Sequence, residues 1–184
     1  MHVDAYLTLL RASERELARG FAVTARHHSE DPDIAPVSAS FARECEARLR
    51  QLAPLVSRYG AKAPPLPDAF ELTVLRATLF HGGRSGLLGI LRDMQNLWLL
   101  AHRVQLLALL LRDTGAALRD KELMDVCSGL QEQTGGQIAW LQSRVKEDGA
   151  QIVITAPTAS PVRNAPWGLA RAWTLQALRP NKRL

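Results

Sequence analysis

Residues 87–112, LLGILRDMQNLWLLAHRVQLLALLLR, form the most apolar stretch of the chain. Apolar residues recur in it at alternating intervals of three and four, which is typical of one face of an α-helix. Asp93 holds one place on that face. The apolar residues of the same face are Ile90, Leu97, Leu100, Val104, Leu107 and Leu111. Because a carboxylate buried in a helical core is costly when it is unpaired, we expect a partner for Asp93 on another helix.

The composition of the whole chain favours an all-α protein. Of its 184 residues, 47% are hydrophobic but only 5% are aromatic, and Leu and Ala dominate. A β-sandwich would need more β-branched and aromatic residues. The length suits one domain with a sizeable core.

The spacing of apolar residues predicts long helices at 3–29, 37–59, 87–112 and 122–146. Two prolines in 31–36 separate the first two helices. A proline-rich connector at 61–67 and a short helix at 69–80 precede the third. Four long helices with one apolar face each predict a four-helix bundle over residues 1–148. Residues 149–184 are predicted to form a linker and a basic tail, beginning with an extended strip at 151–155.

One polar residue on the inner face of each helix suggests a buried polar layer of Glu14, Arg48, Asp93 and Gln137, with Thr134 as an alternative on the last helix. In an up-down-up-down bundle, the helical rise places the four side chains at one level. A long crossover at 61–83 would instead move Asp93 and Gln137 roughly 10 Å from the other two. We favour the first topology, because Arg48 could then neutralise Glu14 and Asp93 together.

Four long helices with carboxylates near the middle of the bundle resemble the ferritin-like superfamily. In that family, a di-iron centre uses a Glu from each of two helices and a Glu-x-x-His motif from each of the other two. Glu14 matches a lone Glu in kind, whereas Asp93 and Asn96 have only the spacing of the motif. Glu44 and Glu132 have no His three residues later. The resemblance implies the fold, and the departures argue against an intact di-iron centre.

An atypical metal site is the alternative interpretation of the same residues. Its ligands would come from Glu14, His28, Glu44, Asp93 and Gln137, and its metal would be iron or manganese. His28 faces inward by its spacing, while the adjacent His27 points elsewhere and is less suited to bind the same ion. No nucleophile, base and orienting residue can be assembled, so the sequence predicts no catalytic residues.

The two cysteines, Cys45 and Cys127, fall among apolar residues of predicted helices and are expected to be buried thiols. The N-terminal sequence has no basic start followed by an apolar run, so no signal peptide is expected. His102, Arg103 and Gln105 interrupt the apolar stretch, which argues against a transmembrane helix. These features predict a cytoplasmic protein.

The C-terminal tail combines aromatic, apolar and basic residues. The candidates for contact with a partner are Trp167, Leu169, Arg171, Trp173, Leu178 and Arg179. Five of the 23 basic residues follow Pro161 without an acidic residue, which leaves the remaining chain balanced. Such a tail favours a protein partner or self-association. A membrane surface is less favoured, and nucleic acid is disfavoured because the charges are few and no readout module is present.

The sequence therefore predicts a non-catalytic helical bundle that acts through protein–protein interaction, as a subunit or cargo of a larger assembly. The alternative is a ferritin-like metal-binding or redox protein.

Overall fold

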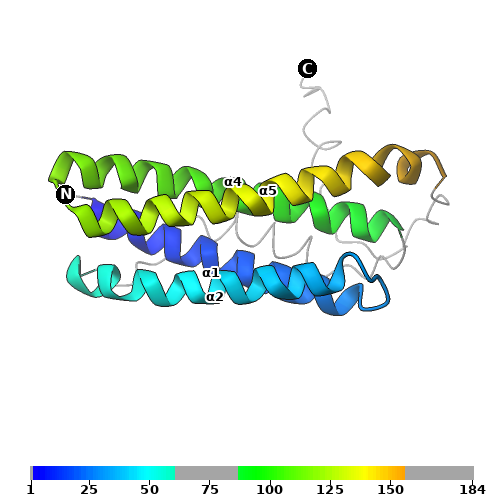
Figure 1. Cartoon of the computed structure of the whole chain (residues 1–184), viewed down its shortest axis with the longest axis horizontal. Coiled ribbons are helices and arrows are strands. Elements are labelled where there is room, and N and C mark those ends of the chain that lie inside the picture. Colours follow the sequence, from blue (N-terminus) through cyan, green and yellow to red (C-terminus); the bar gives the residue numbers. More distant parts are fainter. Residues whose placement is uncertain (1, 61–86, 156–184) are drawn as a thin grey trace, which may run out of the picture.

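The computed structural model describes residues 2–60 and 87–155, which form four helices in an all-α arrangement. The helices are α1 (Val3–His27), α2 (Ala35–Arg58), α4 (Leu87–Leu118) and α5 (Lys121–Thr155) (Figure 1). The predicted four-helix bundle is confirmed. The short helix expected at 69–80 and the tail expected after residue 155 lie outside the described residues. Within the described ranges, no helix is both long and apolar enough to cross a membrane.

Aspartates in the two short turns fix where the following helices begin. Asp31 accepts the backbone N–H groups of Asp33 at 2.9 Å and Ile34 at 3.0 Å, just before α2. Asp120 accepts the N–H of Leu123 at 3.1 Å in the first turn of α5. Such side chains satisfy amides that have no acceptor at a helix start. Each short turn connects two helices that pack closely along their length, α1 with α2 and α4 with α5.

The direction of the helices corrects the expected topology. The end of α2 lies beside the start of α5, where Arg58 pairs with Glu122 at 2.7 Å. The end of α1 lies beside the start of α4, where His28 contacts Asp93 at 3.0 Å. The chain is therefore at one end of the bundle at Gly60 and at the other end at Leu87 (Figure 1). The bundle has one long crossover connection and is not up-down-up-down.

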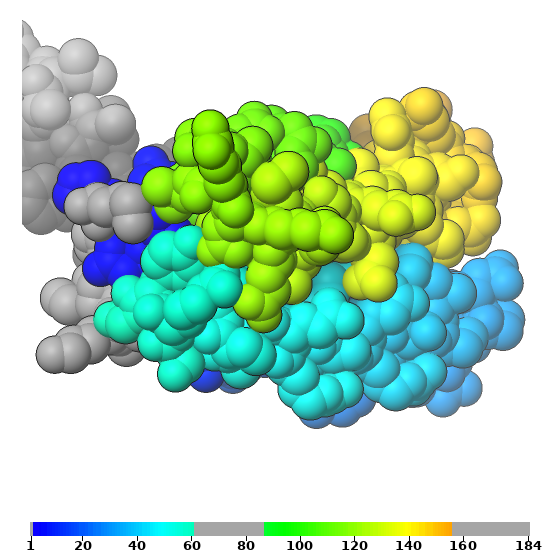
Figure 2. Space-filling model, turned by 60° about the vertical axis from the view of Figure 1, so that its left-hand side comes forward, coloured from blue at the N-terminus to red at the C-terminus, as the bar shows by residue number. Residues whose placement is uncertain are grey.

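The core lies along the bundle axis between the two helix pairs. The predicted inner residues of α4 are buried, except that Ile90 is only partly so. Around the bundle, α1 also packs against α4, whereas α2 and α5 make the loosest of the four neighbouring contacts. Figure 2 shows this last seam between α2 in cyan and α5 in yellow-green to yellow. Long side chains are needed to fill it.

The helix boundaries differ from the prediction at the C-terminal side. Residues 151–155 are helical and not extended, because α5 continues to Thr155. Gly149 and Ile152 are buried and continue the inner face of α5. The bundle therefore extends past 148, where the linker was expected to begin. Similarly, α4 continues past Arg112 to Leu118.

Candidate functional site: a buried cluster around Arg48

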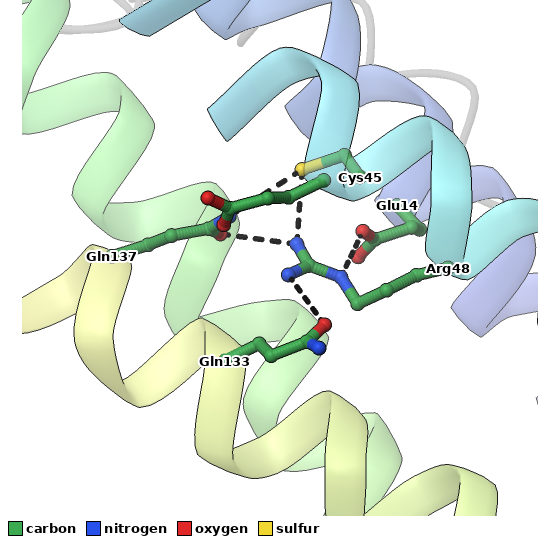
Figure 3. Close-up of polar contacts among 6 residues, drawn as sticks. Glu14, Cys45, Arg48, Gln133 and Gln137 are labelled. Carbon is green, nitrogen blue, oxygen red and sulfur yellow. Dashed lines mark hydrogen bonds and ion pairs between the residues drawn. The ribbon is translucent and has the colours of Figure 1, made fainter. Parts of the chain in front are cut away.

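The side chain of Arg48 lies inside the bundle and is only 1% exposed. Its Nε donates to Oε1 of Glu14 on α1 at 2.6 Å. One terminal nitrogen donates to Oε1 of Gln137 on α5 at 3.1 Å and to Sγ of Cys45 at 2.9 Å. The other donates to Oε1 of Gln133 at 3.4 Å (Figure 3). One guanidinium thus links three helices.

Gln137 extends the cluster because its side-chain amide both accepts and donates a hydrogen bond. Its oxygen accepts from Arg48, and its nitrogen donates to Oε2 of Glu44 at 3.3 Å. The same nitrogen lies 3.8 Å from Sγ of Cys45. We call Glu14, Glu44, Cys45, Arg48, Gln133 and Gln137 the Arg48 cluster. Gln133 is exposed and marks the solvent edge of the cluster.

The loose seam between α2 and α5 explains why an arginine fits here. Elsewhere in the seam, the rings of Phe41 and Trp140 meet edge to face at 5.5 Å. At the level of Arg48, hydrogen-bonded polar side chains span the same space. An apolar side chain of ordinary length would leave a gap or unpaired polar atoms. The cluster therefore holds α2 against both α1 and α5.

The protonation of the cluster is set mainly by burial. Burial raises the pKa of Glu14 above its ordinary value, although the charge and hydrogen bond of Arg48 oppose this. Burial and the nearby Glu14 carboxyl also raise the pKa of the Cys45 thiol. Cys45 therefore remains a neutral thiol at physiological pH and is not an activated nucleophile.

Asp93 does not join this cluster, which corrects the predicted four-residue layer. It is 2% exposed, and its Oδ2 lies 3.0 Å from Nε2 of His28. Its Oδ1 lies 3.4 Å from a terminal nitrogen of Arg92. The reason is the crossover: α4 begins at the end where α1 finishes, so Asp93 lies level with the end of α1. The expectation of a partner on another helix is met by His28 in place of Arg48.

The structure divides the candidate metal ligands between two places, with Glu14, Glu44 and Gln137 in the Arg48 cluster and the other two elsewhere. Glu14 contacts Arg48, Glu44 contacts Gln137, and His28 with Asp93 forms a separate pair at one end of the bundle. Among residues 2–60 and 87–155, no three His, Cys, Asp or Glu side chains are grouped so that they could hold one ion.

Cys45 and Gln133 are members of the cluster that the sequence prediction missed. Each lies one helical turn before a predicted member, Cys45 before Arg48 and Gln133 before Gln137, so the helical period could have indicated them. The proposed tail residues Trp167, Leu169, Arg171, Trp173, Leu178 and Arg179 lie outside the described ranges.

The chain was compared with protein-family models, curated proteins and solved structures, and none of these matches it.

Proposed function

We propose that this chain is a non-catalytic helical bundle that works in the cytoplasm by binding another protein, as a subunit or cargo of a larger assembly. The observation that carries the proposal is the buried guanidinium of Arg48. It donates to Glu14, Cys45, Gln133 and Gln137, so one buried cation joins polar side chains of three helices. Such a centre stabilises the fold and presents no reactive group to a substrate.

A ferritin-like origin is part of this proposal. Ferritin-like bundles have one long crossover connection, as this bundle does. Glu14 provides an inward carboxylate on α1, and the pairs Cys45–Arg48 and Thr134–Gln137 have the i, i+3 spacing of Glu-x-x-His motifs. Arginine, cysteine and amide side chains then stand where the motif has metal ligands. The fold would be retained while the metal chemistry is lost.

The charge of Arg48 favours this interpretation over the metal-binding or redox alternative. A guanidinium remains protonated and would repel a cation placed beside Glu14. It also occupies Oε1, one of the two carboxylate oxygens of Glu14 that a metal could use. An iron or manganese site at Glu14 would therefore require Arg48 to leave its buried position. We accordingly propose that the guanidinium of Arg48 takes the position that a metal ion would have beside Glu14.

The tail supplies the expected contact with the partner. The test compares the full chain with a Trp167→Ala/Trp173→Ala variant, each produced at native level in the source cells. Native-size fractionation of the extract should place the wild type in a larger assembly and the variant at a smaller size. Arg43→Ala, at an exposed position of α2, serves as the control. Equal sizes for all three proteins would contradict a partner-binding role for the tail.

A membrane surface is the competing target for the same tail. Sedimentation with vesicles containing acidic lipids distinguishes the two. We expect the wild type to stay in the supernatant at physiological salt. Sedimentation that is lost in the tail variant would replace the protein-binding role with membrane binding.

A further inference from the structure

The outer face of α4 carries leucines in contact with solvent. Leu99, Leu106 and Leu110 are 50%, 56% and 44% exposed. They belong to a stripe with alternating intervals of four and three, which we call the α4 outer stripe. It consists of Leu99, Arg103, Leu106, Leu110, Asp113 and Ala117. This spacing is that of a helix that packs against another helix at a small angle.

The outer face of α4 differs from that of its neighbour α1, which exposes mainly charged side chains. The exposed positions of α1 include Asp4, Arg15, Arg19 and Arg26. By contrast, α4 is apolar on both its inner and its outer face. A helix of that kind is normally buried on both sides. An apolar stripe left at the surface marks an interaction site.

We infer that the α4 outer stripe binds the same stripe of a second copy of this chain, in an antiparallel arrangement with a two-fold axis near Ala108. That axis places Leu106 of each copy against Leu110 of the other. It also places Arg103 against Asp113 of the other copy and Leu99 against Ala117. Each contact occurs twice, as two-fold symmetry requires.

Charge complementarity selects this register over the alternatives. A parallel pairing would set each stripe residue beside its own copy, so that two Arg103 side chains and two Asp113 side chains would meet. An antiparallel pairing with its two-fold axis at Arg103 would likewise place the two Arg103 guanidiniums against each other. When the axis lies near Ala108, Arg103 of one copy faces Asp113 of the other on each side of the paired leucines, so opposite charges meet. Both charged residues also interact within their own chain. Arg103 has five donors, and Asp113 accepts from Arg112 only at Oδ1, so its Oδ2 can accept from Arg103 of the second copy.

A hollow beside the stripe fits an incoming side chain. It has a volume of about 230 Å³ and lies between the start of α1 and the end of α4. Tyr6, Leu110, Leu111 and Thr114 line it with His2 and Val3. Because it adjoins Leu110, a side chain from the second copy would reach it. The surface is distinct from the C-terminal tail, so this inference goes beyond the proposed function.

Sedimentation equilibrium of the full chain tests the pairing. We expect a mass twice the 20.3 kDa of one chain, and a single-chain mass for Leu106→Glu/Leu110→Glu with unchanged helical circular dichroism. Gln95→Glu, at an exposed position on the same helix, is the matched control and should remain a dimer. A single-chain mass for the wild type would overturn the inference. So would a dimer that survives both glutamates, since it would use another surface such as the tail.

A charge exchange tests the register. Arg103→Glu and Asp113→Arg should each weaken the dimer about tenfold, because each places like charges together. Combining them should restore most of the affinity. A double variant as weak as the product of the two single effects would rule out this register. If the wild type is monomeric and the two glutamates lower its melting temperature, the stripe is covered within one chain and the inference fails.

Discussion

At the scale of single residues, Arg48 determines what the middle of the bundle can do. Moving a charge out of water is costly, and the cost is met only when good hydrogen bonds and an opposite charge are present. Arg48 has both, through Glu14 and three neutral partners. The same contacts occupy the carboxylate oxygen nearest to the guanidinium. We therefore expect the residue that stabilises the interior also to disfavour a cation beside Glu14.

Replacing Arg48 by Met should destabilise the protein strongly. The change leaves Glu14 buried without its counter-charge, which typically costs about 3–5 kcal/mol. Chemical denaturation measures the loss in the free energy of unfolding. Arg43→Met, at an exposed position of the same helix, should change it by less than about 0.5 kcal/mol. Equal stability of the two variants would mean that Arg48 and Glu14 do not interact in solution.

The raised pKa of Glu14 predicts a pH dependence with a definite sign. Between the ordinary pKa near 4.5 and the raised folded-state pKa, the folded protein binds the proton more tightly than the unfolded chain. The contribution of Glu14 to the free energy of unfolding therefore falls as pH rises through that window. Glu14→Gln cannot lose a proton, so the stability of the wild type relative to this variant should decrease as pH rises.

Denaturant titrations at several pH values above 4 measure the difference in unfolding free energy between the wild type and Glu14→Gln. Glu46→Gln, on the exposed side of α2, serves as the control for the loss of one carboxylate. A relative stability that rises with pH would mean that Arg48 lowers the pKa of Glu14 more than burial raises it.

Both thiols should be unreactive in the folded protein. Burial raises the pKa of Cys127 to about 12 and that of Cys45 above its ordinary value. Ellman's reagent should therefore label neither residue in the native protein and both after denaturation. Rapid labelling of a single thiol under native conditions would show that a helix opens at that site.

At the scale of elements, the pairing of His28 with Asp93 joins the end of α1 to the start of α4. The hydrophobic spacing predicted the inner face of each helix, because the face depends on a local period. It could not predict the direction of α4, because direction depends on the route taken between Gly60 and Leu87. The predicted layer failed at Asp93 for that reason. Gln137 joined Arg48 even with the crossover, because long side chains span the seam between α2 and α5.

Substitutions of His28 and Asp93 should be coupled. A double-mutant cycle with His28→Ala and Asp93→Ala should give a coupling free energy of about 0.5–3 kcal/mol, as expected for residues in contact. The same cycle between Asp93 and Arg48 should give a value near zero, since these side chains belong to separate clusters. Strong coupling of Asp93 to Arg48 and none to His28 would restore the up-down-up-down topology.

The end of α5 shows a second limit of local sequence patterns. Residues 151–155 contain a run of β-branched side chains, which predicts an extended strip. In the structure, Ile152 is only 4% exposed and continues the inner face of the helix. A β-carbon added to Gly149 would lie 3.5 Å from Leu91 Cδ1, so α4 and α5 are close here. Packing between helices therefore outweighs the local preference.

At the scale of the whole molecule, the fold class followed from composition and apolar spacing alone. The members of the polar cluster were predicted in part, since Glu14, Arg48 and Gln137 do meet. Their meeting was, however, expected only without a crossover, which was predicted to move Gln137 away from the other two. The crossover and the separate position of Asp93 depend on tertiary contacts that no local pattern contains. The resulting bundle has a neutralised polar centre, and the exposed α4 outer stripe gives it a surface for a second copy.

The metal content of the full chain, purified without a histidine tag and incubated with iron(II) or manganese(II), tests this view of the bundle most directly. Because the guanidinium of Arg48 lies beside Glu14, we expect elemental analysis after desalting to find far less than one ion per chain. Glu14→Gln and Asp93→Ala should not change that content. Stoichiometric iron or manganese that is lost in either variant would contradict the assignment and establish the bundle as a metal-binding protein.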